Sequence, residues 1–253
     1  MDDVIAGRNP VREALRAERP VNKILIVKDS HSGPLREIFA LAREKSIPVQ
    51  KAEKHILNKF AGEAVHQGVI ALVAPKAYVA VEDLLESVQP GEDPFLILLD
   101  EISDPRNLGA ILRTADAAGV HGVIIPRRRS APLTPTVAKS SAGAIEYVPV
   151  ARVANIAQTV DTLKEKGIWL IGADAAGQEL FWDARLDGPL ALVIGGEDKG
   201  LGRLVKERCD ILVRLPMSGR VNSLNASVAA ALLAFEVVRQ RRKALNHEGV
   251  SRY

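Results

Sequence analysis

Polar side chains gather at the start of a predicted helix near the end of the chain. A strand expected at 211–215 stops at Pro216, and Ser223, Asn225 and Ser227 then lead into an apolar run with helical spacing. The free backbone N–H groups of a first helical turn attract a carboxylate or another electron-rich group. Each of these residues alone is more typical of an ordinary helix cap. Together, the strand, loop and helix predict a pocket.

A second candidate ligand contact follows the apolar strand expected at 190–194. Gly195 and Gly196 have no side chain, so the backbone there can approach a ligand closely, and Glu197 is the one charge at the turn. A plain glycine bend at a strand end explains the pair as well when it is taken alone. The turn therefore supports a ligand site only in combination with the pocket near the end of the chain.

Known nucleotide-binding loops do not fit the glycines of this chain. Residues 172–177 have the wrong spacing for the dinucleotide-binding fingerprint and open no clear helix. Residues 195–200 have the spacing of a P-loop but continue with Leu201, where that loop requires a lysine. Neither nucleotide fold is therefore expected.

Three segments, in order along the chain, resemble the signatures of one enzyme family. They read LDEISDPRNLGAILRTA at 99–115, LVIGGEDKGL at 192–201 and LPMSGRVNSLNAS at 215–227. These strings resemble the three signatures of the SpoU/TrmH (SPOUT) family of RNA ribose 2′-O-methyltransferases. Three long motifs in the expected order are far more specific than any one of them.

The resemblance implies transfer of a methyl group from S-adenosylmethionine to a ribose 2′-hydroxyl of RNA. The chain most resembles the members that modify a guanosine of 23S rRNA. Other members act on tRNA or on another rRNA nucleotide, including an adenosine, and these targets remain open. A non-catalytic RNA-binding factor in ribosome assembly is the alternative from another class. The intact polar residues of the signatures argue against it.

The resemblance also implies roles for particular residues. It assigns catalytic roles to Asn107, Arg113, Glu197, Ser223 and Asn225. It assigns contacts with the cofactor to Gly195, Gly196, Leu215, Met217, Leu224 and Asn225. No metal site is implied.

The role of Arg113 needs a physical argument, because the family assigns this position to activation of the ribose hydroxyl. A guanidinium has a pKa above about 12 and does not ordinarily lose a proton. Orienting the hydroxyl and a nearby phosphate is a role that fits its chemistry better. Asn107 and Arg113 are not stacked neighbours on a straight helix, so the loop expected to hold Asn107 must fold back for them to converge.

The order of apolar runs predicts an α/β protein with two domains. Residues 1–75 read as a small α/β domain, 76–94 as a linker with one short amphipathic run, and 95–253 as a larger domain. The resemblance implies that the first is an RNA-binding domain and the last the methyltransferase domain. In the last of these, strands expected at 95–99, 122–125, 147–150, 168–173, 190–194 and 211–215 alternate with helices. Such alternation predicts a parallel sheet covered on both faces. The resemblance adds a trefoil knot.

The composition limits the class of protein and the kind of site. The chain has 253 residues, 47% of them hydrophobic, and a formal net charge of only +3. One cysteine, Cys209, leaves no internal disulfide and no multi-cysteine zinc site, and favours a reducing compartment. The acidic start and the lack of a long apolar run predict a cytoplasmic protein without a leader or a membrane span. His66 reads as structural, because no second ligand lies at metal-binding spacing.

Local clusters of basic residues are the candidate RNA contacts. One cluster is the run 127–129, another lies on the first helix (Arg8, Arg12, Arg16 and Arg19), and a third is near the end (Arg239, Arg241, Arg242 and Lys243). On charge alone, an ordinary solvated face is as good an explanation of the first helix. Because aromatic residues make up only 4% of the chain, base stacking of the RRM type is not expected.

A homodimer is the expected assembly, because the resembling enzymes pair through helices of the knotted domain. Two apolar helical faces are candidate surfaces: Val228, Leu232 and Phe235 on the last helix, and Leu108, Ile111 and Leu112 on the helix of the first signature. Either face would equally suit a helix packed on the sheet.

Overall fold

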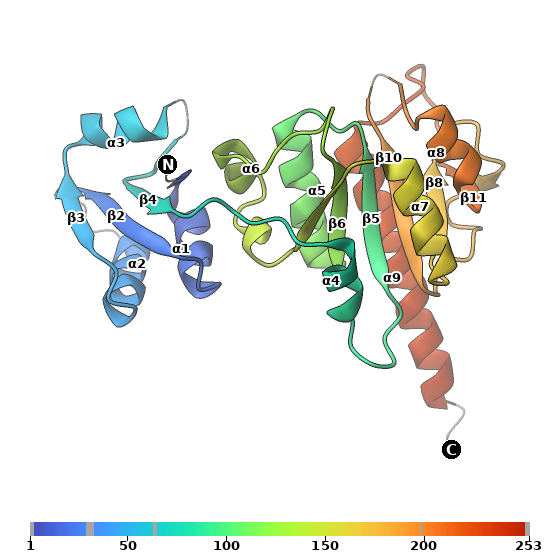
Figure 1. The fold of residues 1–253 in the computed structure, drawn as a ribbon, viewed down its shortest axis with the longest axis horizontal. Helices are drawn as coiled ribbons and strands as arrows, with labels where there is room; N and C mark the ends of the chain where they lie inside the picture. The colour runs from blue at the N-terminus through green and yellow to red at the C-terminus, as the bar shows by residue number, and fades with distance from the viewer. Residues whose placement is uncertain (1–2, 29–32, 63–64, 198, 251–253) are drawn as a thin grey trace.

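The computed structural model describes residues 3–28, 33–62, 65–197 and 199–250, with the backbone alone for 245–250. Two α/β units, each built around its own sheet, lie side by side along the long axis of the molecule (Figure 1). The small unit holds the N-terminus, and the large unit carries the three signature segments. The predicted α/β class is confirmed.

The small unit is a mixed sheet with helices packed against it. Its elements are β1 (Asp3–Ala6), α1 (Arg8–Arg16), β2 (Val21–Val27), α2 (Gly33–Glu44), β3 (Val49–Ala52), α3 (Lys54–Ala61) and β4 (Val69–Val73). Among the described residues the strand order is β1-β4-β2-β3, and only β2 and β3 are parallel. The apolar residues of α1 and α2 bury one face of this sheet.

The large unit is a parallel sheet in the order β7-β6-β5-β10-β8-β11-β9 across its described strands. Its strands are β5 (Phe95–Asp100), β6 (Gly122–Pro126), β7 (Val150–Val153), β8 (Trp169–Ala173), β9 (Glu179–Leu180), β10 (Leu190–Gly195) and β11 (Ile211–Arg214). Its helices are α4 (Val81–Glu86), α5 (Pro105–Ala118), α6 (Pro135–Ser140), α7 (Ile156–Glu165), α8 (Arg203–Arg208) and α9 (Ala226–Val250). The predicted parallel sheet is confirmed.

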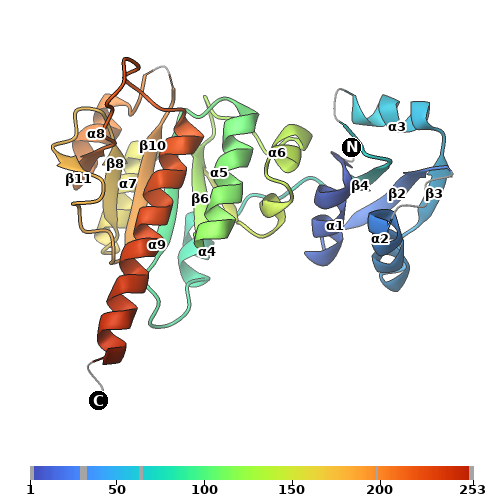
Figure 2. The same cartoon turned by 180° about the vertical axis from the view of Figure 1, so that it is seen from behind.

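Helices cover both faces of this sheet because its central strands are apolar on both sides. Phe95, Ile97 and Leu99 of β5 point to the face covered by α5 and α9, whereas Leu96 and Leu98 point to the face covered by α4 and α7. Figures 1 and 2 show these two layers from opposite sides. The trefoil knot that the resemblance implies stays a prediction.

The last helix does not pack on the apolar face that its spacing suggested. Its buried face consists of small and branched residues, Ala226, Ala230, Leu233, Ala234 and Val237. Val228, Leu232 and Phe235 are 45%, 42% and 50% exposed and form an apolar stripe on the opposite side. The corresponding candidates on α5 are wrong as a surface, since Leu108, Ile111 and Leu112 are core residues that face the sheet.

The residue pattern predicts no strand before the first helix, and two local predictions need correction. Residues Asp3–Ala6 form β1, in which Ile5 pairs with Ala71 of β4. The strand expected at 147–150 is β7 at Val150–Val153, since Ala144–Glu146 form a 3₁₀ turn. The segment expected to be a linker contains α4, whose Leu84 is buried in the core of the large unit. The domain boundaries at 75 and 95 stay a prediction.

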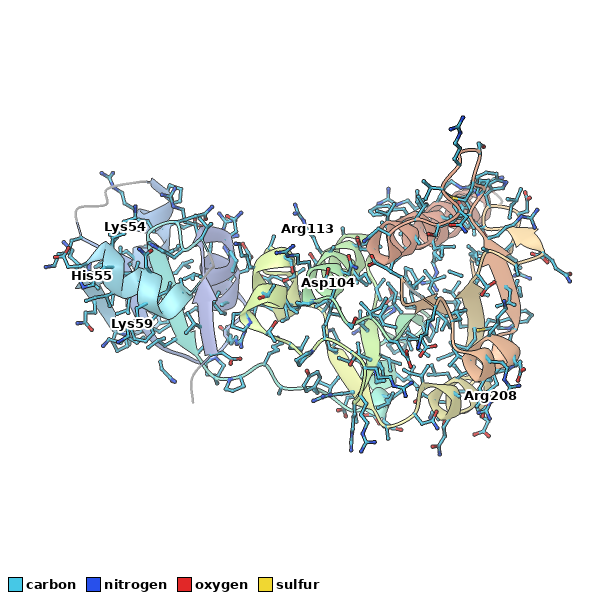
Figure 3. All side chains as sticks on the ribbon, turned by 90° about the horizontal axis from the view of Figure 1, so that it is seen from above. Lys54, His55, Lys59, Asp104, Arg113 and Arg208 are labelled. Atoms are coloured by element: carbon cyan, nitrogen blue, oxygen red, sulfur yellow. The ribbon has the colours of Figure 1, made fainter. Side chains whose placement is uncertain are left out.

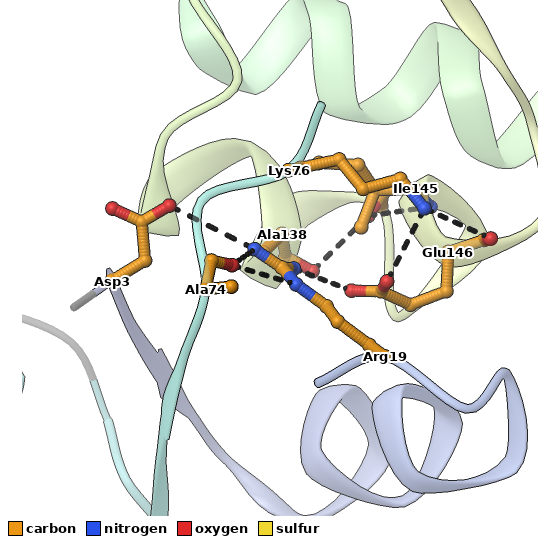
Figure 4. Close-up of polar contacts among 8 residues, drawn as sticks. Asp3, Arg19, Ala74, Lys76, Ala138, Ile145 and Glu146 are labelled. Atoms are coloured by element: carbon orange, nitrogen blue, oxygen red, sulfur yellow. Dashed lines mark hydrogen bonds and ion pairs between the residues drawn. The ribbon is translucent and has the colours of Figure 1, made fainter. Parts of the chain in front are cut away.

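Buried ion pairs join the two units. Arg19 of the small unit donates from Nη1 to Glu146 Oε1 at 2.7 Å, and from Nη2 to the carbonyl of Ala74 at 2.8 Å. The two side chains are only 7% and 1% exposed. Lys76 approaches the other oxygen of Glu146 at 3.4 Å, and Asp3 lies 3.8 Å from Arg19 (Figure 4). Because these charges satisfy one another away from water, they fix how the units sit together.

Tyr147 adds a contact across the same interface. Its hydroxyl donates to Glu13 Oε2 at 2.8 Å. Burial and this hydrogen bond raise the pKa of Tyr147 to about 12. The phenol therefore stays protonated, and able to donate, throughout the neutral range.

No helix of the described residues is long and apolar enough to cross a membrane.

Removing Glu146 is expected to destabilise the protein, because the buried Arg19 loses its nearest carboxylate and keeps only the more distant and more exposed Asp3. Glu146→Ala should lower the free energy of unfolding in urea by about 3 kcal/mol. The matched control is Glu207→Ala, which breaks the exposed Arg203–Glu207 pair of α8 and should cost within about 0.5 kcal/mol. Equal losses in the two variants would contradict a fixed ionic contact between the units.

Candidate active site

The topology of the large sheet places a crevice at the carboxyl ends of β5 and β10. These strands are neighbours, yet α5 follows β5 on one face of the sheet and α8 follows β10 on the other (Figures 1 and 2). In open parallel sheets, ligands bind at such a point because the two connections leave in opposite directions. The first and second signatures supply the chain on the two sides of this crevice.

Hydrogen bonds join the three signatures at this point. Asn107 donates from Nδ2 to Glu197 Oε1 at 2.7 Å, and Asn225 donates from Nδ2 to Asn107 Oδ1 at 3.1 Å. Asn225 also donates to Glu197 Oε1. One carboxylate oxygen thus holds the starts of two helices. Within the described residues, the other oxygen of Glu197 makes no hydrogen bond.

Helix capping orients both asparagines. Asp104 caps α5 by accepting from the N–H of Arg106 at 2.8 Å, and Pro105 occupies the first helical position, where no N–H is needed. Asn107 therefore lies in the first turn of α5 and not in the loop where it was expected. Asn225 caps α9, since its Oδ1 accepts from the N–H and the hydroxyl of Ser227 at 2.9 and 2.6 Å.

The glycine pair after β10 is required by the protein's own backbone. A Cβ on Gly195 would lie 2.1 Å from the carbonyl carbon of Gly200, and a Cβ on Gly196 would lie 2.8 Å from the carbonyl oxygen of Glu101. The loop turns back on itself through a hydrogen bond from Gly200 N to Gly196 O at 2.8 Å. The close neighbours of both glycines are thus backbone atoms of the protein itself, and the expected close approach of a ligand stays a prediction.

Asp100 is a functional candidate that the sequence reasoning missed. It ends β5, is 7% exposed, and accepts from the N–H of Gly202 at 2.8 Å, which ties the loop after β10 to β5. Burial raises the pKa of its carboxyl, and the hydrogen bond from Gly202 acts in the opposite direction. A carboxylate directly after a fully apolar strand was the available signal.

A cavity of about 770 Å³ opens between the loop after β10 and the loop before α9. Five of the predicted cofactor contacts line it: Gly195, Gly196, Leu215, Met217 and Leu224. The catalytic candidates Glu197 and Ser223 line it as well, and Ala229 of α9 forms part of the wall. Its volume lies within the range of small-molecule and cofactor sites. Asn225 is not part of this lining and belongs to the hydrogen-bonded junction.

A smaller cavity of about 240 Å³ adjoins the larger one. It is lined by Asn107 and by residues of the loop after β5, among them Ser103 and Asp104. Gly196, Glu197, Lys199 and Gly200 line both cavities. Glu197 therefore stands at the boundary between two adjoining binding spaces.

An ion pair lies at the smaller cavity. Arg129 donates from Nη1 to Glu101 Oε1 at 2.7 Å, and both residues line the cavity. Both also have positive φ, 59° and 61°. Side chains with a Cβ rarely adopt this conformation, so the surrounding structure holds both loops in a strained form, which is typical of functional sites.

Arg113 does not join the other catalytic candidates within one chain. It lies on the exposed outer side of α5 (Figure 3), roughly 120° around the helix from the buried Asn107. Across the part of the chain that the structure describes, no hydrogen bond or ion pair engages its guanidinium. Asn107 and Arg113 therefore do not converge within one chain, and the catalytic role expected of Arg113 stays a prediction.

Several basic candidates have structural partners instead of free faces. On α1, Arg12 and Arg16 pair with Glu13 and Glu37. After the end of α1, Arg19 pairs with Glu146. On α9, Arg239 pairs with Glu236, whereas Arg241 donates to the carbonyls of Asp93, Pro94 and Gly188. Burial lowers the pKa of Arg241. These arginines support the fold.

Comparison with known proteins identifies the family. Residues 94–235 match the model of the SpoU rRNA methylase family, and residues 4–79 match that of RNA 2′-O ribose methyltransferase substrate binding. A putative TrmH family tRNA/rRNA methyltransferase of Bacillus subtilis (strain 168) is 48% identical over 94% of this chain and 96% of its own length. One from Staphylococcus aureus (strain COL) is 49% identical over 95% of this chain and 97% of its own.

Solved structures agree with these matches. The SpoU methyltransferase AviRb from Streptomyces viridochromogenes, in complex with the cofactor AdoMet, superposes with a TM-score of 0.81 and 28% identity. The likeness covers 96% of this chain and 91% of that one. Sequence signatures, fold and family models thus lead to one conclusion: the chain belongs to the SpoU rRNA methylase family.

Proposed function

We propose that the protein transfers a methyl group from S-adenosylmethionine to a ribose 2′-hydroxyl of RNA, most specifically a guanosine of 23S rRNA. The observation that carries this proposal is the pair of adjoining cavities with Glu197 at their boundary. Methyl transfer needs the methyl group of the donor and the oxygen of the acceptor to be held close together and in line. One large and one small space that share a wall suit that arrangement.

The larger cavity fits the cofactor. Leu215, Met217 and Leu224 give it apolar walls, as an adenine ring requires, and the turn at Gly195 and Gly196 brings backbone groups to its edge. When bound, the cofactor would supply a methyl group that is already activated on a sulfonium. AviRb was solved with AdoMet, which supports the same assignment here.

The smaller cavity fits the acceptor ribose. Glu197 lines it, and among the described residues one carboxylate oxygen has no partner, since the other accepts from Asn107 and Asn225. That free oxygen is suited to accept a hydrogen bond from the 2′-hydroxyl and to take its proton as the new C–O bond forms. Ser223, which lines the larger cavity, has a hydroxyl available to orient either substrate.

Arg113 is proposed to act on the site of a partner chain in a homodimer. Its guanidinium is exposed and unpaired among the described residues, as a group that works in another chain would be. The exposed stripe of Val228, Leu232 and Phe235 on the neighbouring helix α9 supplies an apolar surface for pairing. Arg113 would then orient the ribose hydroxyl and an adjacent phosphate, with its fork of N–H donors.

The proposal also includes a particular RNA target and a cellular compartment. The match of residues 4–79 to a substrate-binding model supports RNA binding by the small unit. The relatives bear names that cover both tRNA and rRNA. The proposal of 23S rRNA as the target therefore rests on the resemblance of this chain's sequence motifs to those of the 23S rRNA enzymes. A cytoplasmic location is proposed on the cysteine content.

Filling the larger cavity should weaken cofactor binding without unfolding the protein. Ala229→Phe places a ring in that space, so the affinity for S-adenosylhomocysteine should fall by about 10- to 100-fold, the equivalent of about 1–3 kcal/mol of overpacking. The control is Arg242→Phe, at an exposed site of the same helix outside the cavity. Calorimetry should show parent affinity for this control. Parent affinity in Ala229→Phe would rule out the cavity as the cofactor site.

Complementation tests whether Arg113 works across the dimer. Arg113→Ala and Glu197→Gln chains should each be inactive alone and should still form dimers. Unfolded together and refolded, they should recover about a quarter of the parent activity, because half of the dimers are mixed and each of these has one intact site.

Native mass spectrometry of the refolded mixture should show the mixed dimers. Mixed dimers without methyl transfer would show that Arg113 acts in its own chain. A monomer in light scattering would remove the dimer from the proposal. Arg113→Lys should be inactive as well, since lysine lacks the planar fork.

Mapping of 2′-O-methyl groups in cells tests the target. RNA from cells with and without the gene should differ at one guanosine of 23S rRNA. A missing methyl group in tRNA, or at an adenosine, would replace the target and keep the chemistry. Unchanged rRNA and tRNA would favour a non-catalytic assembly factor.

A further inference from the structure

A third cavity, also on the carboxyl edge of the large sheet, lies outside the site described above. It has a volume of about 600 Å³ and lies where β6 and β7 end and α7 begins. Arg127, Arg152, Asn155 and Gln158 contribute to its lining, together with Tyr78. β6 pairs directly with β5, so this cavity and the acceptor cavity occupy the same edge of the sheet.

Arg152 is held in place without a carboxylate. Its guanidinium lies over the ring of Tyr78, 5.2 Å from the ring centre, and its Nη2 donates to the carbonyl of Arg127 at 2.9 Å. Its Nε is buried and has no partner among the described residues. An arginine fixed by stacking, with donors to spare, is prepared to receive an anion.

The charges around the cavity favour an anion. Over the described ranges, neither Arg127 nor Arg152 forms an ion pair, although Glu82 is also in the lining. The first turn of α7 has no acidic residue, and its backbone N–H groups add partial positive charge. The Nδ2 of Asn155 and the side chain of Gln158 add neutral hydrogen-bonding groups, as contacts with a sugar or base require.

The arginine run at 127–129 links this cavity to the acceptor site. Arg127 lines the present cavity, and Arg129 lines the acceptor cavity. Arg128, between them, is exposed and lines neither. Residues two positions apart are separated by at most about 7 Å, and the run bends at Arg129, so it spans a short distance along the edge.

We propose that this cavity binds a nucleotide that flanks the methylated one in the RNA, with Arg127 and Arg152 holding its phosphate. The inference rests on the proposed function, because it assumes an RNA acceptor in the smaller cavity. β6 and β7 form the side of the sheet that lies nearer the small unit (Figure 1). An RNA strand held by the small unit would therefore pass this cavity on its way to the acceptor site.

Neutral variants of the two arginines that line the cavity test the proposal. Arg127→Gln and Arg152→Gln should each weaken binding of fluorescently labelled 23S rRNA fragments by about 10-fold, and each should make the plot of log K against log salt shallower by about one unit or less. The KM for RNA should rise while kcat at saturating RNA is kept, because neither residue contacts the reacting atoms. Arg128→Gln removes the same charge one position away and should change affinity by less than about two-fold.

Several outcomes would overturn the assignment. Equal weakening in Arg128→Gln would mean diffuse attraction, and parent affinity in the other two variants would mean that no phosphate binds there. A free-anion site would bind inorganic phosphate in calorimetry, lose it in Arg127→Gln and Arg152→Gln, and leave RNA affinity unchanged.

Binding of S-adenosylhomocysteine with the parent affinity should show that each variant is folded. Failure of the proposed function is read separately, as absence of methyl transfer by the parent protein. The RNA affinities of parent and variants remain comparable in that case.

Discussion

Two hydrogen bonds to one oxygen of Glu197 organise the site. They bring together the first turn of α5, the loop after β10 and the cap of α9, which lie far apart in the sequence. Each asparagine also makes a further contact, since Asn107 accepts from Asn225 and Asn225 caps α9. Because one carboxylate satisfies both amides, it fixes the wall shared by the two cavities and leaves its other oxygen available for chemistry.

Two larger constraints place this junction. The parallel sheet sends α5 and α8 to opposite faces from neighbouring strands, which opens the crevice at β5 and β10. The buried pair of Arg19 and Glu146 then holds the small unit beside β6 and β7. RNA bound by the small unit would reach the acceptor cavity along the carboxyl edge, past the arginine run at 127–129. The site thus depends on tertiary contacts well beyond its own lining.

Some of this was predictable from the sequence. Continuous apolar strands with helices between them predicted the parallel sheet, and strand ends located Glu197 and the loop before α9. Helical spacing did not predict which side of α9 is buried, because Ala230 and Ala234 allow the helix to lie close to the sheet while larger residues face outward. Spacing did indicate that Asn107 and Arg113 are not neighbours on one helix, but it did not show that Asn107 lies in the first turn of α5 and not in the loop before it. The cavity lined by Arg127 and Arg152 could not be predicted either, because β6 and β7, which position these residues, are separated in the sequence and meet only in the folded sheet.

The central claim is that a methyl group passes between the two adjoining cavities to a ribose oxygen. The most direct measurement is incubation of the protein with S-adenosylmethionine carrying a deuterated methyl group and with 23S rRNA, followed by nuclease digestion and mass spectrometry of the nucleosides. The account predicts that the heavy methyl group appears in the ribose fragment of a guanosine and in no base fragment. A labelled base, or RNA without label in the presence of bound cofactor, would contradict it.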